Sequence, residues 1–390
     1  MPPGAGRRGE HGDVQCVVQG VRPLPGAGGG AVTCAATGPR PGAEQGQGRD
    51  MEYRQLGGTG VFVSSIALGA MTFGGADSPI WGTVGGLGAQ EADAIVGAAL
   101  DAGVNLVDTA DVYGDGESES ILGKVLGSRR DDVVLATKAS ARTGPGPNDA
   151  GATRYHLLRS IEASLSRLGT DRIDLFQIHG FDPLTPLEET LGALDDAVRQ
   201  GKVRYIGASN FAARQLVKAL GVSAREGLAR FVSHQCYYSL VGRDVEHEIL
   251  PASREENVAF LSYAPLASGL LSGKFDRSGA TEEGARRNTT DWPPTDREKA
   301  YDAVDVLRVV AGRHGTTVAR AALAWNIAQP GVTSAIVGAR RVPQLLDSLG
   351  AVEVALTAQD LAELDAATAP PTAYPAWIQQ QVAPSRLPQA

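Results

Sequence analysis

The sequence predicts an α/β protein that closes into a (β/α)8 TIM barrel, with an N-terminal β-hairpin across its bottom and a disordered tail before it. From residue 51 onward, short apolar runs rich in β-branched residues alternate with segments whose apolar residues recur at helical spacing. Eight such pairs over about 290 residues fit the roughly 250 residues of a closed parallel barrel better than an open doubly wound sheet.

The elements follow one another in a regular order from this point. A hairpin-like segment, Tyr53 to Val63, comes first and is expected to close the bottom of the barrel. The expected strands are 66–69, 104–107, 132–138, 173–178, 203–207, 231–235, 257–263 and 334–337. The expected helices are 90–101, 118–127, 153–167, 187–199, 211–220, 245–255, 297–313 and 343–350.

The first fifty residues differ in composition from the rest of the chain. They hold 13 glycines and 6 prolines, a content typical of low-complexity sequence. Residues 26–31 formally satisfy the dinucleotide fingerprint G-x-G-x-x-A, but Pro23 and Pro25 stand where the preceding strand would lie, so we do not expect a Rossmann loop. We expect a disordered Gly/Pro-rich tail at 1–50, a barrel at 51–370 and a C-terminal extension at 371–390.

Charge and cysteine content narrow the class of partner. A formal net charge of −8 argues against nucleic acid, which usually requires a basic face to displace counterions. The spacing of Cys16, Cys34 and Cys236 fits neither a disulfide framework nor a zinc site, which favours a reducing cytoplasm and no metal. No apolar run approaches the roughly 18 residues that would cross a membrane. A small-molecule substrate is the expectation.

Three of the expected connections are long. They are 73–89 with Trp81, the Gly/Pro-rich 139–152, and 272–296 with Trp292. Because the loops that follow the strands build the active face of a barrel, we expect these three to form the walls and the lid of a substrate pocket.

Titratable residues stand at the ends of three consecutive expected strands. Asp108 and Tyr113 follow strand 104–107, Lys138 ends strand 132–138, and His179 follows strand 173–178. Taken one at a time, they read as a cap, a packed aromatic, a snorkelling cation and a core histidine. Their joint placement on the catalytic face of a barrel favours function, since charges are rarely buried unless they are paired.

Together the four residues can make an acid. The ammonium of Lys138 beside the Tyr113 hydroxyl favours the phenolate, and so lowers the pKa of Tyr113 from its unperturbed value near 10. Asp108 would hold the ammonium in place, and a neutral His179 would hydrogen-bond a carbonyl oxygen. A Schiff base on Lys138, as in aldolases, is an alternative use of the same lysine.

Several runs of sequence resemble the aldo-keto reductase superfamily, and the resemblance covers residues 51 to about 368. The runs are D-T-A-D-x-Y-G from Asp108, I-H-x-x-D from Ile178 to Asp182, G-A-S-N-F from Gly207 to Phe211, S-Y-A-P-L-A-S-G-L-L-S-G-K from Ser262 to Lys274, and I-V-G-A-R from Ile336 to Arg340. In that family the residues corresponding to Asp108, Tyr113, Lys138 and His179 form the catalytic tetrad. Relatives that reduce a steroid double bond carry glutamate in place of the histidine, so His179 implies carbonyl reduction.

The resemblance also implies that the chain binds NADP(H). The nicotinamide end would meet Ser209, Asn210 and Gln235 at its carboxamide, Tyr263 at the face of its ring, Asp108 at its ribose, and Thr72 after the first strand. The pyrophosphate would lie under Pro265, Leu266, Gly269 and Lys274. The adenosine end would meet Gly338, Arg340 and Gln344, with Arg340 facing the 2′-phosphate, because a guanidinium matches a phosphate in charge and geometry.

One position departs from the family pattern. Asp347-Ser348 stands where the family usually has Glu-Asn, and Ser348 is too short to make the expected contact with adenine. Both residues are expected in the cofactor site, with a weaker hold on adenine. The resemblance leaves a second function open, because the β subunits of potassium channels use this fold as a cofactor-binding partner of another protein. A monomer or a weak homo-oligomer is expected.

Overall fold

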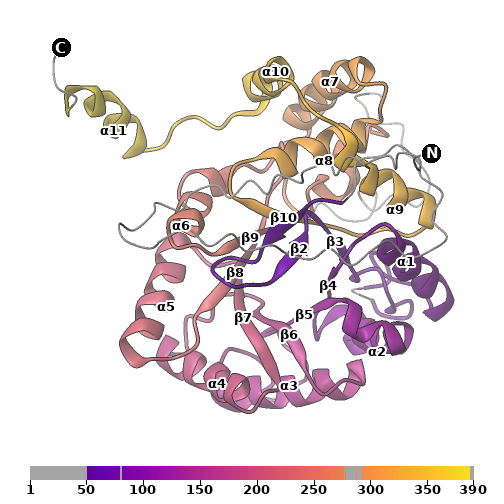
Figure 1. The fold of residues 1–390 in the computed structure, drawn as a ribbon, viewed down its shortest axis with the longest axis vertical. Helices are drawn as coiled ribbons and strands as arrows, with labels where there is room; N and C mark the ends of the chain where they lie inside the picture. Colours follow the sequence, from indigo (N-terminus) through magenta and orange to yellow (C-terminus); the bar gives the residue numbers. More distant parts are fainter. Residues whose placement is uncertain (1–50, 80, 276, 278–286, 288–291, 387–390) are drawn as a thin grey trace, which may run out of the picture. The chain divides into compact units, whose positions relative to one another are not determined.

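The computed structural model describes residues 51–79, 81–275, 277, 287 and 292–386. Within these residues eight parallel strands form a closed barrel in the order β10-β3-β4-β5-β6-β7-β8-β9, and helices surround it (Figure 1). This confirms the predicted fold class. The expectations for the tail, including its glycine-rich run, Cys16 and Cys34, lie outside the described residues.

All eight expected strands are present, with ends that shift by a few residues at most. They are β3 (Ile66–Gly69), β4 (Leu106–Asp108), β5 (Val134–Ala139), β6 (Ile173–Ile178), β7 (Val203–Ser209), β8 (Phe231–Tyr237), β9 (Ala259–Tyr263) and β10 (Val332–Val337). The helices are α1 (Ala89–Asp101), α2 (Glu117–Leu126), α3 (Arg154–Leu168), α4 (Leu187–Arg199), α5 (Ala213–Glu226), α6 (Ile249–Glu255), α7 (Arg297–Arg313), α8 (Val318–Ala328), α9 (Val342–Leu349), α10 (Ala358–Thr368) and α11 (Ala376–Val382).

Three of these helices were not predicted. α8 directly precedes β10 and packs against it, whereas α7, which was expected in that place, packs on α8 and α10. Periodicity missed α8 because its sequence, VARAALAWNIA, is apolar on nearly every side, as befits a helix buried all round. α10 begins with a capping box made by Thr357 and Asp360. α11 has no buried residue.

A short hairpin covers the N-terminal end of the barrel, as predicted, and Figure 1 looks onto this end. Its strands β1 (Tyr53–Gln55) and β2 (Phe62–Ser64) pair antiparallel. The turn between them buries Leu56 completely in the apolar cluster that fills the inside of the barrel. Gly57 has a φ of +56°, and a Cβ on it would lie 2.5 Å from the carbonyl oxygen of Val232. The turn therefore needs glycine at this position, both for its conformation and for the close approach.

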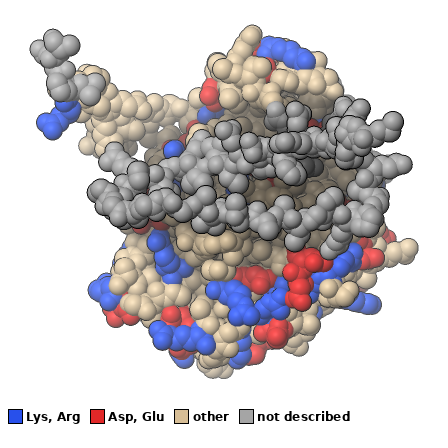
Figure 2. Space-filling view, in the orientation of Figure 1, with Lys and Arg blue, Asp and Glu red and all other residues tan. Residues whose placement is uncertain are grey.

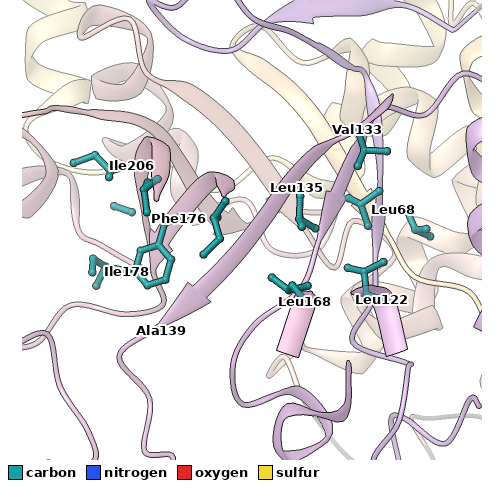
Figure 3. Close-up of a cluster of buried hydrophobic side chains, with 14 of the residues drawn as sticks. Leu68, Leu122, Val133, Leu135, Ala139, Leu168, Phe176, Ile178 and Ile206 are labelled. Atoms are coloured by element: carbon teal, nitrogen blue, oxygen red, sulfur yellow. The ribbon is translucent and has the colours of Figure 1, made fainter. Parts of the chain in front are cut away.

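The apolar core between strands and helices forms an outer layer. Figure 3 shows Leu135 and Leu68 of the barrel strands beside Leu168 of α3 and Leu122 of α2, in the same buried cluster as Phe176 and Ile178. Truncating a buried side chain of this kind to alanine usually costs 2–5 kcal/mol. This layer fixes the helices to the barrel, so that the inward-facing positions are left for other uses.

Inside the barrel, the side chains change from apolar to polar toward the C-terminal ends of the strands. Leu106, Ala136 and Leu175 belong to the buried inner cluster. Side chains two residues apart on a strand share a face. The next inward positions are therefore Asp108, Lys138 and Gln177, all buried. A polar layer thus rests on an apolar one at the face where barrels carry their active sites.

The described surface carries both signs of charge. Lys and Arg mix with Asp and Glu over the lower part of the view in Figure 2, and ion pairs such as Arg225 with Glu188 and Arg199 with Asp195 join neighbouring side chains. Among the described residues no helix has the length and apolar character needed to span a membrane.

Candidate active site

A cavity of about 420 Å³ opens at the C-terminal ends of the barrel strands. Three of the four predicted catalytic residues, Asp108, Tyr113 and His179, line it, and Lys138 lies buried beneath. Predicted cofactor residues that line it are Thr72, Asp108, Ser209, Asn210, Gln235, Tyr263, Pro265, Leu266, Gly269, Lys274, Gly338, Arg340, Gln344 and Ser348. Residues that lie far apart in the sequence thus meet in one continuous space.

The amine of Lys138 connects the carboxylate of Asp108 to the phenol of Tyr113. Its Nζ lies 2.5 Å from Oδ1 of Asp108, 2.8 Å from the carbonyl oxygen of Thr109 and 3.3 Å from the hydroxyl oxygen of Tyr113. Burial alone would lower the pKa of Lys138, but the Asp108 carboxylate and the Tyr113 hydroxyl raise it above its ordinary value. The lysine is therefore an ammonium that donates to the phenolic oxygen, an arrangement that favours the phenolate.

His179 lies beside the phenol ring of Tyr113. Its ring centroid lies 5.7 Å from that of Tyr113, in an edge-to-face arrangement. Burial, and then the charge of Lys138, lower the pKa of His179 to about 3. The imidazole is neutral at physiological pH, so it has one nitrogen that donates and one that accepts. It can offer a hydrogen bond without bringing a second positive charge to the site.

The Asp108 carboxylate has two further donors that were not expected in this role. Its Oδ2 accepts from Nε2 of Gln235 at 2.9 Å and from Nε2 of Gln177 at 3.2 Å. Gln177 was not among the site residues predicted from the sequence. Its position could have been found, because it lies two residues beyond Leu175 on the same strand and therefore also faces the inside of the barrel. A polar residue at an inward position near a strand's C-terminal end marks the site layer.

The loop after β9, from Ala264 to Lys274, has an unusual backbone and is called the cradle. Ala264, Ala267, Ser268 and Gly269 all have positive φ, and the Ser268 hydroxyl oxygen is buried with no hydrogen-bond partner among the described residues. Non-glycine residues rarely adopt such angles. The N–H groups of Ala267 and Gly269 donate to the carbonyl oxygens of Ala264 and Leu266, which fixes the turn and leaves the Ser268 hydroxyl to meet a ligand. With Lys274 at the end of this loop, the segment suits a pyrophosphate.

Residues that were predicted at the nicotinamide end of the cofactor site are already joined to one another. Asn210, with a φ of +56°, donates from Nδ2 to the carbonyl oxygen of His179 at 2.9 Å and accepts at Oδ1 from the Tyr263 hydroxyl at 3.0 Å. Its side chain therefore ties the end of β9 to the segment that carries His179. The strained backbone at Asn210 is held by its neighbours, as is typical of residues at functional sites.

The opposite end of the cavity is formed by the start of α9. Arg340 donates from Nη2 to the Thr83 carbonyl oxygen at 2.8 Å, and its backbone N–H donates to Oε1 of Gln344 at 3.0 Å. At the start of α9, Pro343 has no N–H, and the N–H groups of Gln344 and Leu345 donate to the Arg341 carbonyl oxygen. The two guanidinium groups of Arg340 and Arg341, which both line the cavity, are therefore the groups that fit a phosphate at this end.

Asp347 is the one predicted cofactor residue that does not line the cavity. Its carboxylate faces α8, where Oδ1 accepts from Nε of Arg320 at 3.0 Å and Oδ2 accepts from the Thr317 hydroxyl at 3.1 Å. These bonds join α9 to the start of α8. In this structure Asp347 is therefore placed as a structural residue, while Ser348 is buried and faces the cavity.

Two of the three long loops supply the cavity walls. Val84 comes from the first loop, and Phe275 and Trp292 come from the third. The Trp292 ring is stacked on Tyr263 at a centroid distance of 5.8 Å, and Trp81 meets Tyr113 edge-on at 5.4 Å. Three aromatic rings, those of Tyr113, Tyr263 and Trp292, thus line the cavity, and Trp81 packs behind Tyr113.

The loop 139–152 does not line the cavity, contrary to the expectation. It folds on itself, because Asp149 accepts from the Gly146 N–H at 2.8 Å, and it is tied to the next loop by Asp182, which accepts from the Ala152 N–H at 2.7 Å. Asp182 also accepts from the Thr185 hydroxyl. The aspartate of the I-H-x-x-D run therefore braces two loops.

The carboxylate of Asp111, three residues after Asp108, is also buried. Asp111 is 3% exposed, and neither of its carboxylate oxygens has a hydrogen-bond partner among the described residues. Burial, and then the charge of Glu119, raise its pKa from 3.8 to about 7, although Arg167 and Lys138 act in the opposite sense. Asp111 is therefore neutral at acidic pH and is forced toward ionisation as the pH rises.

This carboxyl predicts a stability difference that depends on pH. A raised pKa in the fold means that stability is fully present below pH 3.8 and is lost as pH rises toward 7. Asp111→Asn cannot ionise, so its free energy of unfolding relative to the parent should rise by about 3 kcal/mol from pH 5 to pH 8. Urea unfolding of both proteins at the two pH values measures this. If the difference in unfolding free energy between variant and parent does not change with pH, the pKa of Asp111 is not raised in the folded protein.

Comparison with known proteins agrees with this geometry. The chain matches the model of the Aldo/keto reductase family over residues 65–369. It is 40% identical over 327 residues to the uncharacterized oxidoreductase YrpG of Bacillus subtilis (strain 168), covering 81% of this chain and 95% of the relative. It is 36% identical to a probable voltage-gated potassium channel subunit beta of Arabidopsis thaliana (78% and 92% covered) and 33% identical to versiconal hemiacetal acetate reductase of Aspergillus parasiticus (83% and 99% covered). The chain therefore belongs to the aldo/keto reductase family of oxidoreductases.

Proposed function

We propose that this protein reduces an aldehyde or a ketone to an alcohol with NADPH, and that Tyr113 is the proton donor. The observation that carries the proposal is the buried ammonium of Lys138, fixed by Asp108 and 3.3 Å from the Tyr113 hydroxyl oxygen at the cavity. A phenol in this position is an acid whose conjugate base is stabilised before the reaction begins.

Each residue has one task in this mechanism. The bound nicotinamide supplies the hydride. Tyr113 gives its proton to the carbonyl oxygen as negative charge develops there, and Lys138 stabilises the phenolate that remains. The neutral imidazole of His179 hydrogen-bonds the same oxygen and orients it. Asp108 keeps the ammonium in place and offsets the cost of burying it.

The residues that line the cavity support NADP(H) as the cofactor. Ser209, Asn210 and Gln235 would hold the carboxamide, and Tyr263 would face the ring. The cradle from Ala264 to Lys274 would cover the pyrophosphate. Arg340 and Gln344, at the start of α9, would meet the 2′-phosphate and ribose, with Ser348 beside adenine. Asp347 is left out of this assignment because its carboxylate is held by Arg320 and Thr317.

Arg340→Ala is expected to raise the KM for NADPH at least tenfold more than the KM for NADH, because only NADPH has the 2′-phosphate, and a charge-assisted pair of this kind is worth roughly 1.5–3 kcal/mol. Steady-state kinetics with both cofactors measures the ratio. Loss of the bond to Thr83 would affect both cofactors alike, so the ratio isolates the phosphate contact. Equal changes in the two KM values would remove Arg340 from the phosphate site.

The test of the proposed reaction is a substrate panel. NADPH binding is first measured by quenching of protein fluorescence, and NADPH absorbance is then followed with aldehydes, ketones and α-dicarbonyls. We expect saturable oxidation of NADPH by at least one class of carbonyl. Tight NADPH binding with no turnover on any class would favour a cofactor-binding protein over a reductase.

Two other functions are separable from this one. The relative named as a potassium channel subunit beta supports a cofactor-binding regulatory role, which a stoichiometric partner in a co-purification would indicate. An aldolase would need the free amine of Lys138 to form a Schiff base. The Asp108 carboxylate, which keeps this lysine an ammonium, argues against an aldolase. Borohydride trapping of a substrate on Lys138 would support an aldolase.

A further inference from the structure

We propose that Gln177 is a positioning residue which, through Asp108, sets the acid strength of Tyr113, and that Ser233 and Gly207 fix its amide in the required orientation. The proposal rests on the assignment of Tyr113 as the acid. It adds three residues, on β6, β8 and β7, to a site so far made of four.

A chain of hydrogen bonds connects Ser233 to Tyr113, and Asp108 accepts in it from both sides. The Ser233 hydroxyl donates to Oε1 of Gln177 at 3.4 Å, and Nε2 of Gln177 donates to Oδ2 of Asp108 at 3.2 Å. The other carboxylate oxygen of Asp108 faces Lys138, whose ammonium reaches the Tyr113 hydroxyl. Because the serine occupies the amide oxygen, the amide N–H group is turned to the carboxylate.

A glycine on β7 leaves room for the contact between Gln177 on β6 and Ser233 on β8. In the strand register Gly207 pairs with Gln177 on one side and with Ser233 on the other, so it stands between them. A Cβ on Gly207 would lie 2.2 Å from the Ser233 hydroxyl oxygen and 3.1 Å from Cγ of Gln177. Its φ lies outside the left-handed region, so this glycine is needed for space and not for backbone conformation.

Lys138 on β5 is the charged group that pairs with Asp108. Tyr113, after β4, is hydrogen-bonded to that ammonium, and His179, after β6, contacts the Tyr113 ring and is neutral. Gln177 and Gln235 share Oδ2 with each other. Without the Gln177 donor, more of the carboxylate's charge is directed to the Lys138 ammonium. The ammonium then attracts the phenolic oxygen less, and Tyr113 becomes a weaker acid.

A direct test titrates the phenol without relying on turnover. Phenolate absorbance is followed from pH 6 to 11 in the parent, in Gln177→Met and in Ser233→Ala. For each protein, the same curve measured on its Tyr113→Phe counterpart is subtracted, which isolates residue 113. We expect the isolated transition to move to higher pH in both variants, and further in Gln177→Met. An unmoved transition in both would overturn the proposal and leave the carbonyl reductase assignment intact.

Kinetics supply a second signature. Loss of a hydrogen bond to a charged group predicts a roughly tenfold lower kcat for Gln177→Met. NADPH binding by fluorescence should be unchanged within about twofold, because Gln177 does not line the cavity. A glutamate at 177 can donate to Asp108 only when the pair holds a proton, so Gln177→Glu should approach parent kcat at low pH and lose it as pH rises.

The variants also separate positioning from simple core filling. A filler role predicts that every variant scales kcat by a constant at all pH values, and this outcome would overturn the proposal. If Gln177→Met does not fold, Gln177→Glu and Ser233→Ala test the proposal. Gln177→Glu keeps the volume of the side chain, and Ser233→Ala leaves Gln177 itself in place. Gly207→Ala is expected to reproduce the shift of Gln177→Met because the added methyl displaces both partners. If the parent itself lacks turnover, the titration alone decides.

Discussion

Tyr113→Phe is expected to lower kcat for carbonyl reduction by roughly 10²–10⁴-fold, the usual contribution of a positioned general acid. The substitution removes only the hydroxyl that lies 3.3 Å from Nζ of Lys138. The ring can keep its edge contacts with Trp81 and His179, so the cavity should retain its shape. NADPH affinity should therefore be unchanged. Fluorescence titration and steady-state rates on the best carbonyl substrate measure the two quantities.

Tyr237→Phe is the matched control for this experiment. It removes a neighbouring phenolic hydroxyl, one that is hydrogen-bonded to Ser239 at 2.9 Å and does not line the cavity. We expect kcat within about threefold of the parent, since the variant loses one neutral hydrogen bond. Parent-like turnover by Tyr113→Phe would reject the phenol as proton donor. A large loss in both variants would indicate general damage to this end of the barrel.

The parts of the fold that the sequence predicted are those with a simple period. The barrel strands are apolar runs bounded by polar residues. Because the strands are parallel, their C-terminal ends meet at one face, independently of the conformation of the loops. Asp108, Tyr113, Lys138 and His179 could be grouped from strand order alone for that reason. α8 was missed because a helix buried on every side lacks amphipathic periodicity, and an apolar run of that kind does not by itself show whether it forms a helix or a strand.

Other features depend on contacts that no local pattern contains. The carboxylate of Asp347 turns to Arg320, and the carboxylate of Asp182 binds the Ala152 N–H of loop 139–152, because of partners that only the folded chain brings near. Gln177 is an intermediate case. Its inward direction follows from the parity of its strand, but the donor that orients it lies 56 residues away in the sequence, on β8. A glycine inside β7 was the available hint that two neighbours approach each other there.

Lys138→Met is expected to destabilise the protein by about 3–5 kcal/mol and to abolish turnover. The lysine side chain is 1% exposed and Asp108 is 5% exposed, so the variant leaves a buried carboxylate without its counter-ion. Hydrogen bonds from Gln177 and Gln235 to that carboxylate place the expected loss toward the lower end of the range. Urea unfolding measures the stability, and NADPH oxidation measures the activity.

The double variant Asp108→Asn with Lys138→Met separates the two roles of the pair. Replacing a buried ion pair by neutral groups is often close to neutral for stability, so unfolding should return toward the parent while turnover stays lost. Lys202→Met is the surface control: Lys202 pairs with Glu162 in an exposed setting, and its removal should cost at most about 1 kcal/mol and leave kcat unchanged. If Lys138→Met were as stable as Lys202→Met, the lysine would not be compensating a buried charge. Tyr113 would then have no fixed ammonium to make it an acid.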